Sequence, residues 1–441
     1  MPTFILLRSG LSMKNLLLKI AALMLAVSLS LVAFGCGDSG SDDTTQTTGD
    51  YKYRIATGTR DVVDENGEVV LDEDGNATQE SYKYYIITGY QVSSEDSLKM
   101  ASGDFSTIQD KYRNIEIPKT GRDLDEDNDY PVEEIEAGAF TNQIILTSVK
   151  VGNNIKTIGE GAFAGCTNLK SLALPFVGGS KDATSSARVF GHIFGSSSTS
   201  EANVEVTAKI TERKDDAGTS ILTESTVTFK VPSSLEEVDL SASDMVNVSE
   251  CAFYGMTMLK KVTLPETVTE IDSHAFYGCS GLTSFDLKNV KTIYESGFAS
   301  CTALKEVKWG TVEVIKKSAF EGCTTLGTKR FVDETTTDAE ALLTIKLPSS
   351  VKEIGKNAFK GCSGIKYFDM KGTSVQVIDN STFASCLALV KITINDDTVI
   401  KAGAFTNCSE LAIDTNSDNK DDSYNVVGTY VAEVGAFDDL K

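Results

Sequence analysis

Apolar residues recur along most of the chain with the spacing of short, half-buried strands. Leu169, Leu172 and Leu174 follow the spacing L-x-x-V-x-L, and related apolar residues stand at the same offsets in 259–264 and 389–394. The last two apolar positions alternate with a polar residue, as they do in a strand that buries one face. We therefore expect one short strand in each of these units.

A second apolar position joins these units into repeats. Nine phenylalanines each follow a Val or Ile by five residues, and most are 22 to 24 residues from the next one; they are Phe140, Phe163, Phe253, Phe276, Phe298, Phe320, Phe359, Phe383 and Phe405. Two wider gaps, of 90 and 39 residues, indicate insertions. This period is typical of a leucine-rich-repeat solenoid. We expect a β-rich fold with one short parallel strand per repeat, stacked about 4.8 Å apart, and short turns or helical arms on the other side.

Most cysteines occupy one position of this repeat. Seven stand three residues after the repeat Phe: Cys166, Cys279, Cys301, Cys323, Cys362, Cys386 and Cys408. Met256 takes this position in another repeat. Because a site that accepts Met is apolar, and free Cys is among the most buried residue types, we interpret these residues and Cys251 as buried packing residues. Disulfides or a metal site are the alternatives, but the chain has two histidines and no C-x-x-C pair.

The segment LPSSVKEIGKNAFKGCSGIKYFDM (347–370) resembles the BspA-like, treponemal-type leucine-rich repeat of bacterial surface proteins. The resemblance covers about 132–413, roughly two-thirds of the chain. Residues 84–140 are similar to the opening rung of that family, and 174–195 resemble an insertion seen there. The resemblance implies a curved solenoid and, in the best-known members, adhesion to host matrix or plasma proteins.

The N-terminal segment predicts export and a lipid anchor. From Met13, which looks the better start, two lysines precede an apolar run from Ile20 to Phe34 that is too short for an ordinary membrane span. Residues 33–36 resemble the bacterial lipobox, in which the cysteine, here Cys36, becomes the acylated first residue. We expect a signal peptide over 1–35 and a polar, flexible tether over 36–50. A plain signal peptide is the alternative.

The remaining segments are expected to cap or interrupt the array. Residues 51–131 alternate and contain Asn-Gly and Asp-Gly turns, so we expect a β-rich N-terminal cap and opening rung ahead of the solenoid at 132–413. Within the solenoid, 177–230 is expected to project as a hairpin, and 327–341 to be a shorter excursion. The repeat decays into a C-terminal cap over 414–441.

Two acidic stretches, 123–134 and 414–425, invite comparison with calcium-binding loops. In the first, acidic residues stand at most of the ligand positions, but Asn128 replaces the required Gly and no helix is expected on either side. We interpret both as acidic surface turns and predict no metal and no cofactor.

Charge and motifs narrow the function to binding. A net charge of −22 disfavours nucleic acid, which needs a cationic surface, and contact with the membrane is expected through the anchor alone. The sequence contains no H-E-x-x-H, G-x-S-x-G, Walker or dinucleotide-binding motif, so we expect no enzyme. The first hypothesis is a cell-surface lipoprotein that binds or adheres to host or matrix proteins. The alternative is an envelope structural or glycan-capture lipoprotein.

The expected ligand site lies on the strand face. The residues on either side of the central apolar residue of each strand point away from the core, Glu306 among them. Solenoids use this face for partners, and binding energy concentrates in aromatic and charged residues. The best cluster consists of Lys308, Lys346, Tyr367, Asp369 and Lys391. The insertion at 177–230 is the rival site for a protein or glycan ligand.

Overall fold

The computed structural model describes residues 46–414 except for 49–50, 66, 73, 91–92, 103–111, 124–126, 197–202, 217–218, 329–342, 396 and 409–410. The predicted signal peptide, Cys36 and most of the predicted tether lie outside the described residues, as do most of the 327–341 excursion and 415–441. Within the part of the chain that is described, no helix is long and apolar enough to span a bilayer.

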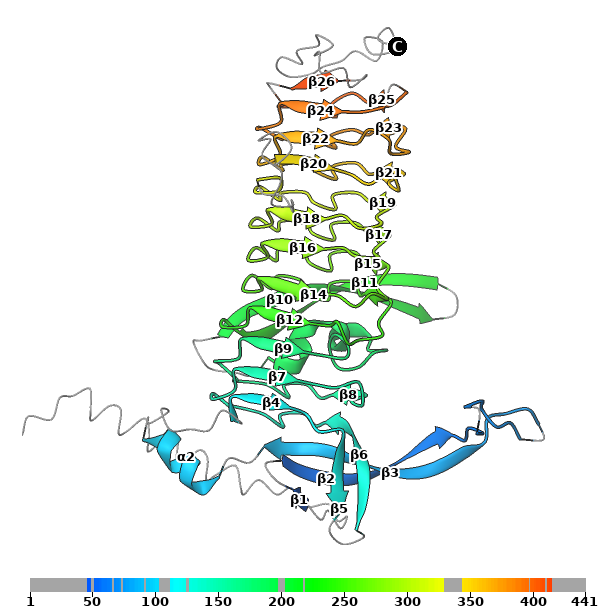
Figure 1. The fold of residues 1–441 in the computed structure, drawn as a ribbon, viewed down its shortest axis with the longest axis vertical. Coiled ribbons are helices and arrows are strands. Elements are labelled where there is room, and N and C mark those ends of the chain that lie inside the picture. The colour runs from blue at the N-terminus through cyan, green and yellow to red at the C-terminus, as the bar shows by residue number, and fades with distance from the viewer. Residues whose placement is uncertain are drawn as a thin grey trace, which may run out of the picture.

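The described chain forms an elongated stack of strands with a separate sheet at its N-terminal end (Figure 1). That sheet has the order β1–β2–β3–β6–β5, with β8 also pairing with β6. Its members are β1 (Gln46–Thr48), β2 (Tyr51–Asp61), β3 (Gln79–Tyr90), β5 (Thr120–Asp123), β6 (Asn128–Ile135) and β8 (Thr157–Ile158). Helix α2 (Ser94–Ala101) follows β3 in the chain.

This first sheet includes part of the predicted tether and most of the first acidic stretch. Residues 46–48 lie in the segment expected to be a flexible tether, but they pair antiparallel with β2, because the edge of β2 offers unpaired backbone groups to an extended neighbour. Most of the acidic stretch at 123–134 lies on two strands that pair antiparallel, because Asp123 ends β5 and residues 128–134 belong to β6. Among the described residues, no group of His, Cys, Asp or Glu side chains could hold a metal ion.

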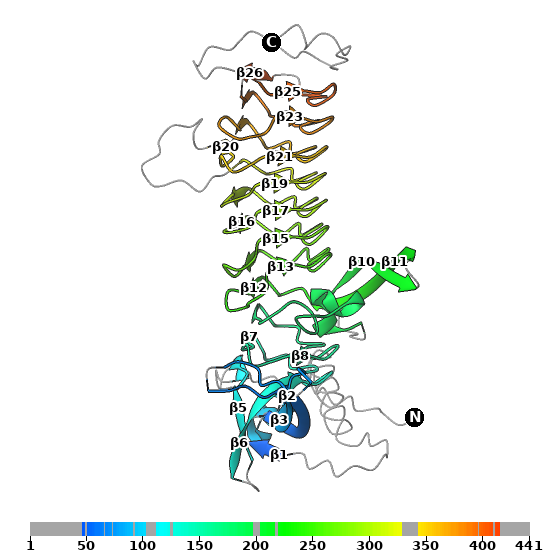
Figure 2. The same ribbon diagram turned by 90° about the vertical axis from the view of Figure 1, so that its right-hand side faces the viewer.

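The solenoid has two rows of short parallel strands (Figures 1 and 2). The first row forms the strand face and comprises β4 (Asn114–Glu116), β7 (Ser148–Lys150), β9 (Ser171–Ala173), β12 (Glu237–Asp239), β14 (Lys261–Thr263), β16 (Ser284–Asp286), β18 (Glu306–Lys308), β20 (Thr344–Lys346), β22 (Tyr367–Asp369), β24 (Lys391–Thr393) and β26 (Ala412–Asp414). These strands contain the L-x-x-V-x-L positions, so the predicted β-rich solenoid with one such strand per repeat is confirmed.

The second row lies just before the turn that carries the repeat Phe. It comprises β13 (Asn247–Val248), β15 (Glu270–Ile271), β17 (Thr292–Ile293), β19 (Val314–Ile315), β21 (Glu353–Ile354), β23 (Val377–Ile378) and β25 (Val399–Ile400). Each of these two-residue strands ends at the Val or Ile that stands five residues before a repeat Phe. The five-residue offset in the sequence is therefore the distance along the chain from the second strand to the core.

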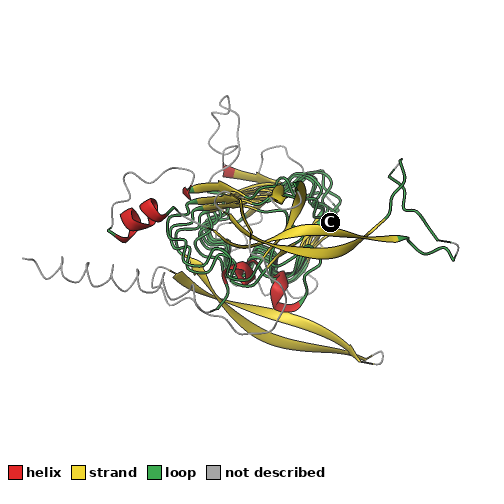
Figure 3. Ribbon diagram, turned by 90° about the horizontal axis from the view of Figure 1, so that it is seen from below, coloured by secondary structure: helices red, strands yellow, loops and turns green. Residues whose placement is uncertain are grey.

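A column of phenylalanine rings fills the centre of the stack. Neighbouring rings from Phe253 to Phe405 lie 5.0 to 5.5 Å apart and within 11° of parallel. In-register strands place identical side chains one above another, so each ring packs against those of its neighbouring rungs. Viewed along the axis, the rungs superpose in one outline, and two hairpins extend beyond it (Figure 3).

The larger insertion contributes to the core before it leaves the stack. Its 3₁₀ helices η2 (Ser185–Arg188) and η3 (Phe190–Phe194) precede an antiparallel hairpin of β10 (Asn203–Asp216) and β11 (Thr219–Pro232). The ring of Phe190 lies 5.1 Å from that of Phe253, and the main-chain N–H of Phe163 donates to the carbonyl of Ile193. Part of the insertion thus takes the place of a rung, and the hairpin then projects sideways (Figure 2).

Two backbone positions in every repeat have left-handed geometry. Residues two before and two after each of the nine repeat phenylalanines have φ between 56° and 76°. The first set is Gly138, Gly161, Cys251, His274, Ser296, Ser318, Asn357, Ser381 and Gly403; the second is Asn142, Gly165, Gly255, Gly278, Ser300, Gly322, Gly361, Ser385 and Asn407. Gly, Asn and Ser dominate because other side chains are strained at positive φ. These turns let the chain reverse around each Phe.

Candidate ligand-binding face

Strands β20, β22 and β24 bring four of the five predicted site residues together. Parallel pairing places Tyr367 beside Lys391, and Lys346 beside Asp369. The central residues of the same strands, including Phe368, are buried. The four polar side chains therefore stand on the outer face over a rigid, packed support, as the alternation of a strand requires.

The charges on this face are partly neutralised by neighbours. The Nζ atom of Lys346 lies 3.1 Å from a carboxylate oxygen of Asp369, and the ammonium group of Lys366 lies 5.5 Å from the centre of the Tyr367 ring. Both contacts are exposed enough that each contributes only a few tenths of a kcal/mol to about 1 kcal/mol. The first contact balances the charge of Lys346, and the second places a positive charge beside the Tyr367 ring.

Lys308, the fifth predicted residue, belongs to a different part of the sheet. It lies on β18, which pairs with β16, whereas β20 begins the next group of strands. Its Nζ atom is 3.0 Å from a carboxylate oxygen of Asp286 on β16. The structure therefore separates Lys308 from the other four residues by an interruption in the strand face.

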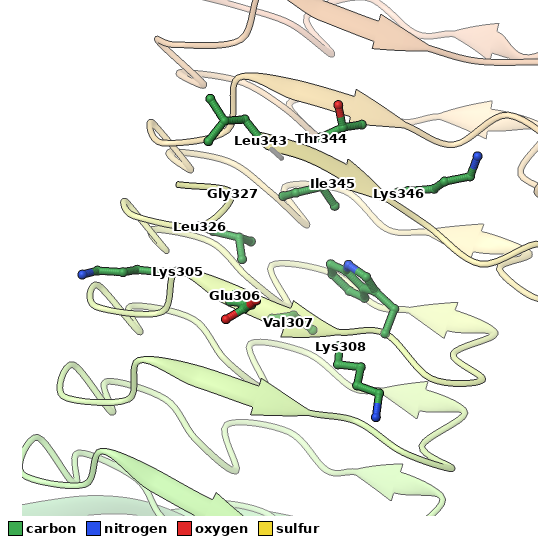
Figure 4. Close-up of a pocket in the computed structure, with 11 residues that line it drawn as sticks. Lys305, Glu306, Val307, Lys308, Leu326, Gly327, Leu343, Thr344, Ile345 and Lys346 are labelled. Carbon is green, nitrogen blue, oxygen red and sulfur yellow. The ribbon is translucent and has the colours of Figure 1, made fainter. Parts of the chain in front are cut away.

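A cavity of about 150 Å³ lies at this interruption (Figure 4). It is lined by residues 305–309 on one side and 343–346 on the other, with Leu326 and Gly327 between them. The main-chain N–H of Gly327 donates to the carbonyl of Lys305 over 3.0 Å, which closes one end. Spacing in the sequence did not predict this cavity, because the 39-residue gap shows that an insertion is present but not how the strands beside it separate.

The expected orientation of Glu306 is wrong. We expected its side chain to point outward, but it is 6% exposed, and Val307 is the half-exposed residue of β18. In the paired strands β16 and β22, the central residue is the buried one. On β18, Val307 instead lines the cavity, because β20 is not paired alongside to cover it.

The thiols lie in the core, away from this face. All eight cysteines within the described residues are buried and free, so the interpretation as buried thiols is confirmed over disulfides. Burial raises the pKa of Cys166 and that of Cys279 to about 12. Each of the seven repeat cysteines also donates a hydrogen bond to the carbonyl of the repeat Phe one rung earlier, a role that the interpretation as apolar packing missed.

The rival site in the insertion has its own polar contacts. Arg188 and Glu250 are linked by a 2.8 Å ion pair that joins η2 to the solenoid. Burial lowers the pKa of His192 on η3. These groups fix the base of the β10–β11 hairpin, and the side chains of 209–224 lie outside what the structure describes. The described part of the insertion therefore offers a projecting ribbon of two paired strands.

Comparisons with known proteins agree with the architecture. Six copies of the BspA type leucine rich repeat region match residues 129–185, 225–341 and 331–421, more than half of the chain. No curated protein sequence matches.

Similar solved structures include a leucine-rich repeat protein from Bacteroides ovatus (19% identity, 75% of this chain and 77% of that chain, TM-score 0.34). A leucine rich cell surface protein from Faecalibacterium prausnitzii (20%, 87% and 78%, TM-score 0.33) and the leucine rich repeat protein of T. pallidum (18%, 68% and 87%, TM-score 0.28) are also similar. On the strength of the repeats in its sequence and of the solenoid they build, the chain belongs to the BspA type leucine-rich-repeat family.

Proposed function

We propose that this protein is a lipid-anchored bacterial surface protein that binds a host or matrix protein without catalysing a reaction. Proteins of its family are typically bacterial surface or secreted proteins, and they are generally non-enzymatic binding proteins. The anchor would be Cys36, acylated after removal of residues 1–35 and followed by a polar segment. Two or more acyl chains on this cysteine would hold the protein stably at the membrane.

One observation carries the assignment of the binding face. Tyr367 and Lys391 lie side by side on paired strands, next to the Lys346–Asp369 ion pair. Paired strands fix the backbone that carries these side chains before a ligand arrives, so little backbone entropy is lost on binding. An aromatic ring among charges of both signs is typical of the residues that dominate binding energy in protein interfaces.

The experiment compares two variants for binding to immobilised matrix and plasma proteins and to a glycan array. The double variant Tyr367→Ala, Lys391→Glu is expected to weaken binding to the protein ligand by at least about tenfold, equivalent to about 1.4 kcal/mol, with a nearly unchanged melting temperature. The matched control is Lys261→Glu, which reverses an exposed charge on β14 of the same face.

Deletion of 177–230 is not a clean test of the hairpin, because Phe190 in that segment packs in the core. Excision of 209–224 shortens the hairpin and leaves η3 in place. If this shortened protein loses binding and the strand-face double variant keeps it, the hairpin is the site. Binding to glycans without binding to any matrix or plasma protein would favour the alternative of a glycan-capture lipoprotein.

A further inference from the structure

At the interruption between β18 and β20, one backbone donor lacks the bond that rungs with paired strands make. After paired strands, the next N–H donates across to the neighbouring rung: that of Leu287 to the carbonyl of Lys308, and that of Leu347 to the carbonyl of Asp369, both over 2.9 Å. Trp309 occupies the same position after β18. Within the described residues, its main-chain N–H has no such bond to Lys346.

The side chain of Trp309 presents a second donor at the same place. Trp309 is 8% exposed and lines the cavity, and its ring packs edge-on against Phe320 at 5.3 Å. Among the residues that the structure describes, none accepts a hydrogen bond from its indole N–H. A tryptophan N–H in a largely buried ring usually has a partner. The cavity therefore suits a ligand that brings hydrogen-bond acceptors.

The cavity also has room for an apolar group. Val307, Leu326, Leu343 and Ile345 contribute aliphatic surface around its volume of about 150 Å³. An apolar cavity of that order can hold a group the size of benzene. One leucine-sized side chain fits this description.

Three lysines surround the opening. Lys305 lies at one end of the cavity, and Lys308 and Lys346 lie toward the other (Figure 4). Lys308 and Lys346 each form an ion pair with an aspartate, whereas Lys305 has no ion-pair partner among the described residues. Among the described residues that line the cavity, Glu306 is the only one with a carboxylate, and it is buried. In a chain with a net charge of −22, this opening is a local site for anionic groups.

We infer that the interruption between β18 and β20 is the docking site for an extended, acidic peptide segment of the protein ligand. This inference rests on the proposed function, since it names the kind of segment that the strand face takes. In an extended peptide, successive side chains alternate between two faces. An apolar side chain enters the cavity, the flanking acidic side chains meet the lysines, and a peptide carbonyl accepts a hydrogen bond from Trp309, as in strand addition to a sheet edge.

Trp309 is the only tryptophan of the chain, so its fluorescence reports on this site alone. The full-length protein is titrated with the peptide acetyl-Thr-Glu-Leu-Glu-Thr-amide and with its counterpart that carries lysine for glutamate. We expect the acidic peptide to shift the emission of Trp309 and protect it from acrylamide quenching, and the basic peptide to do neither. Lys305→Glu should lower the affinity for the acidic peptide by at least about tenfold, and Lys261→Glu on β14 should leave this affinity unchanged.

Val307→Phe tests the cavity without a change of charge. It should abolish the fluorescence response while circular dichroism and melting temperature stay close to those of the original protein. Equal affinity for the two peptides, full binding by Lys305→Glu, or no response to the acidic peptide would each overturn the inference. A response to heparin in place of the peptide would assign the site to an anionic glycan and overturn it as well.

The proposed function and this inference can fail separately. Equal binding of a matrix protein with and without Val307→Phe would support the proposed function and contradict the inference. If Trp309 responds to the acidic peptide but the protein binds no matrix or plasma protein, the proposed function is contradicted and the peptide site is supported.

Discussion

The thiol of Cys301 donates a hydrogen bond to the carbonyl oxygen of Phe276, 3.1 Å away in the preceding rung. The same relationship recurs between Cys323 and Phe298. These thiols thus join neighbouring rungs in addition to filling space. A buried carbonyl left without a donor costs about 1–3 kcal/mol, which explains why a residue that is both small and able to donate suits this position.

Replacement of Cys301 by Ala is therefore expected to lower the free energy of unfolding by about 1–3 kcal/mol, because the packing of the sulfur and its hydrogen bond are both lost. Cys301→Asp should cost more, since it buries an unpaired charge. Urea unfolding at pH 7 measures both, with Thr302→Ala, an exposed neighbour, as the control. If the Cys301→Ala protein is as stable as the original, the thiol does not contribute to the free energy of unfolding.

Thiol labelling tests the burial of the whole set. Burial raises the pKa of Cys251 to about 12 and that of Cys408 to about 11, and the thiolate is the reactive form. We expect the eight cysteines after Cys36 to react with an aromatic disulfide reagent at pH 8 only after denaturation. Mass spectrometry of protein prepared without reductant should find no disulfide among them; a bridge between neighbouring rungs would contradict the assignment.

Two aspartates at the same repeat position should respond to pH in opposite directions. Asp272 and Asp379 each follow the last residue of a second-row strand. Burial raises the pKa of Asp272. The main-chain N–H of Asn380, helped by Lys401, lowers the pKa of Asp379. The original protein thus loses stability at Asp272 as pH rises from the unfolded pKa through the higher folded one, and loses it at Asp379 as pH falls through the lowered folded pKa.

Asp272→Asn is accordingly expected to raise the melting temperature at pH 7, and Asp379→Asn to lower it. Both differences should shrink towards pH 3, where the aspartates approach protonation in the unfolded chain. Differential scanning calorimetry from pH 3 to 7 measures the two curves. The same sign of change in both variants at pH 7 would show that burial and hydrogen bonding do not set these pKa values.

The left-handed turns predict a further difference. Ser381 has a φ of 58°. Valine is strained in this region by about 1–2 kcal/mol, so Ser381→Val should destabilise the protein by that order, whereas Ser381→Gly should change stability little. Ser374→Val, at an exposed residue with negative φ, is the matched control. Equal effects of the two valine substitutions in urea unfolding would argue against a left-handed turn.

The lipid anchor is tested by Cys36→Ser, which removes the acceptor of the acyl chains. We expect the variant to leave the membrane fraction and appear as soluble protein, because the sequence predicts contact with the membrane through this anchor alone. An unchanged N-terminal mass in a variant that stays membrane-bound would show that Cys36 is not acylated.

The repeat made most of the fold predictable, and the interruptions in it did not. Regular offsets between Ile271, Phe276 and Cys279 encode contacts between neighbouring rungs, which are local in sequence. The left-handed positions carry Gly, Ser or Asn in most repeats, a pattern that would have predicted these turns. By contrast, Phe190 fills the core from inside an insertion.

The candidate site was likewise predictable only where the repeat is regular. Alternation within a strand was enough to place Tyr367 beside Lys391, because the strands stack in register. It did not predict the cavity beside Trp309, since the separation of β18 from β20 depends on the geometry of an insertion. Glu306 was misplaced for the same reason.

The parallel stacking of the rungs has a mechanical consequence. The hydrogen bonds between rungs run along the long axis of the stack, and each rung contacts only its neighbours. A pull along that axis, between a membrane-held N-terminal end and a ligand on the strand face, would load the few bonds of one rung boundary at a time. Such a protein would lengthen under tension by peeling rungs in succession, and the boundaries without first-row pairing, between β14 and β16 and between β18 and β20, would offer the fewest bonds to that pull.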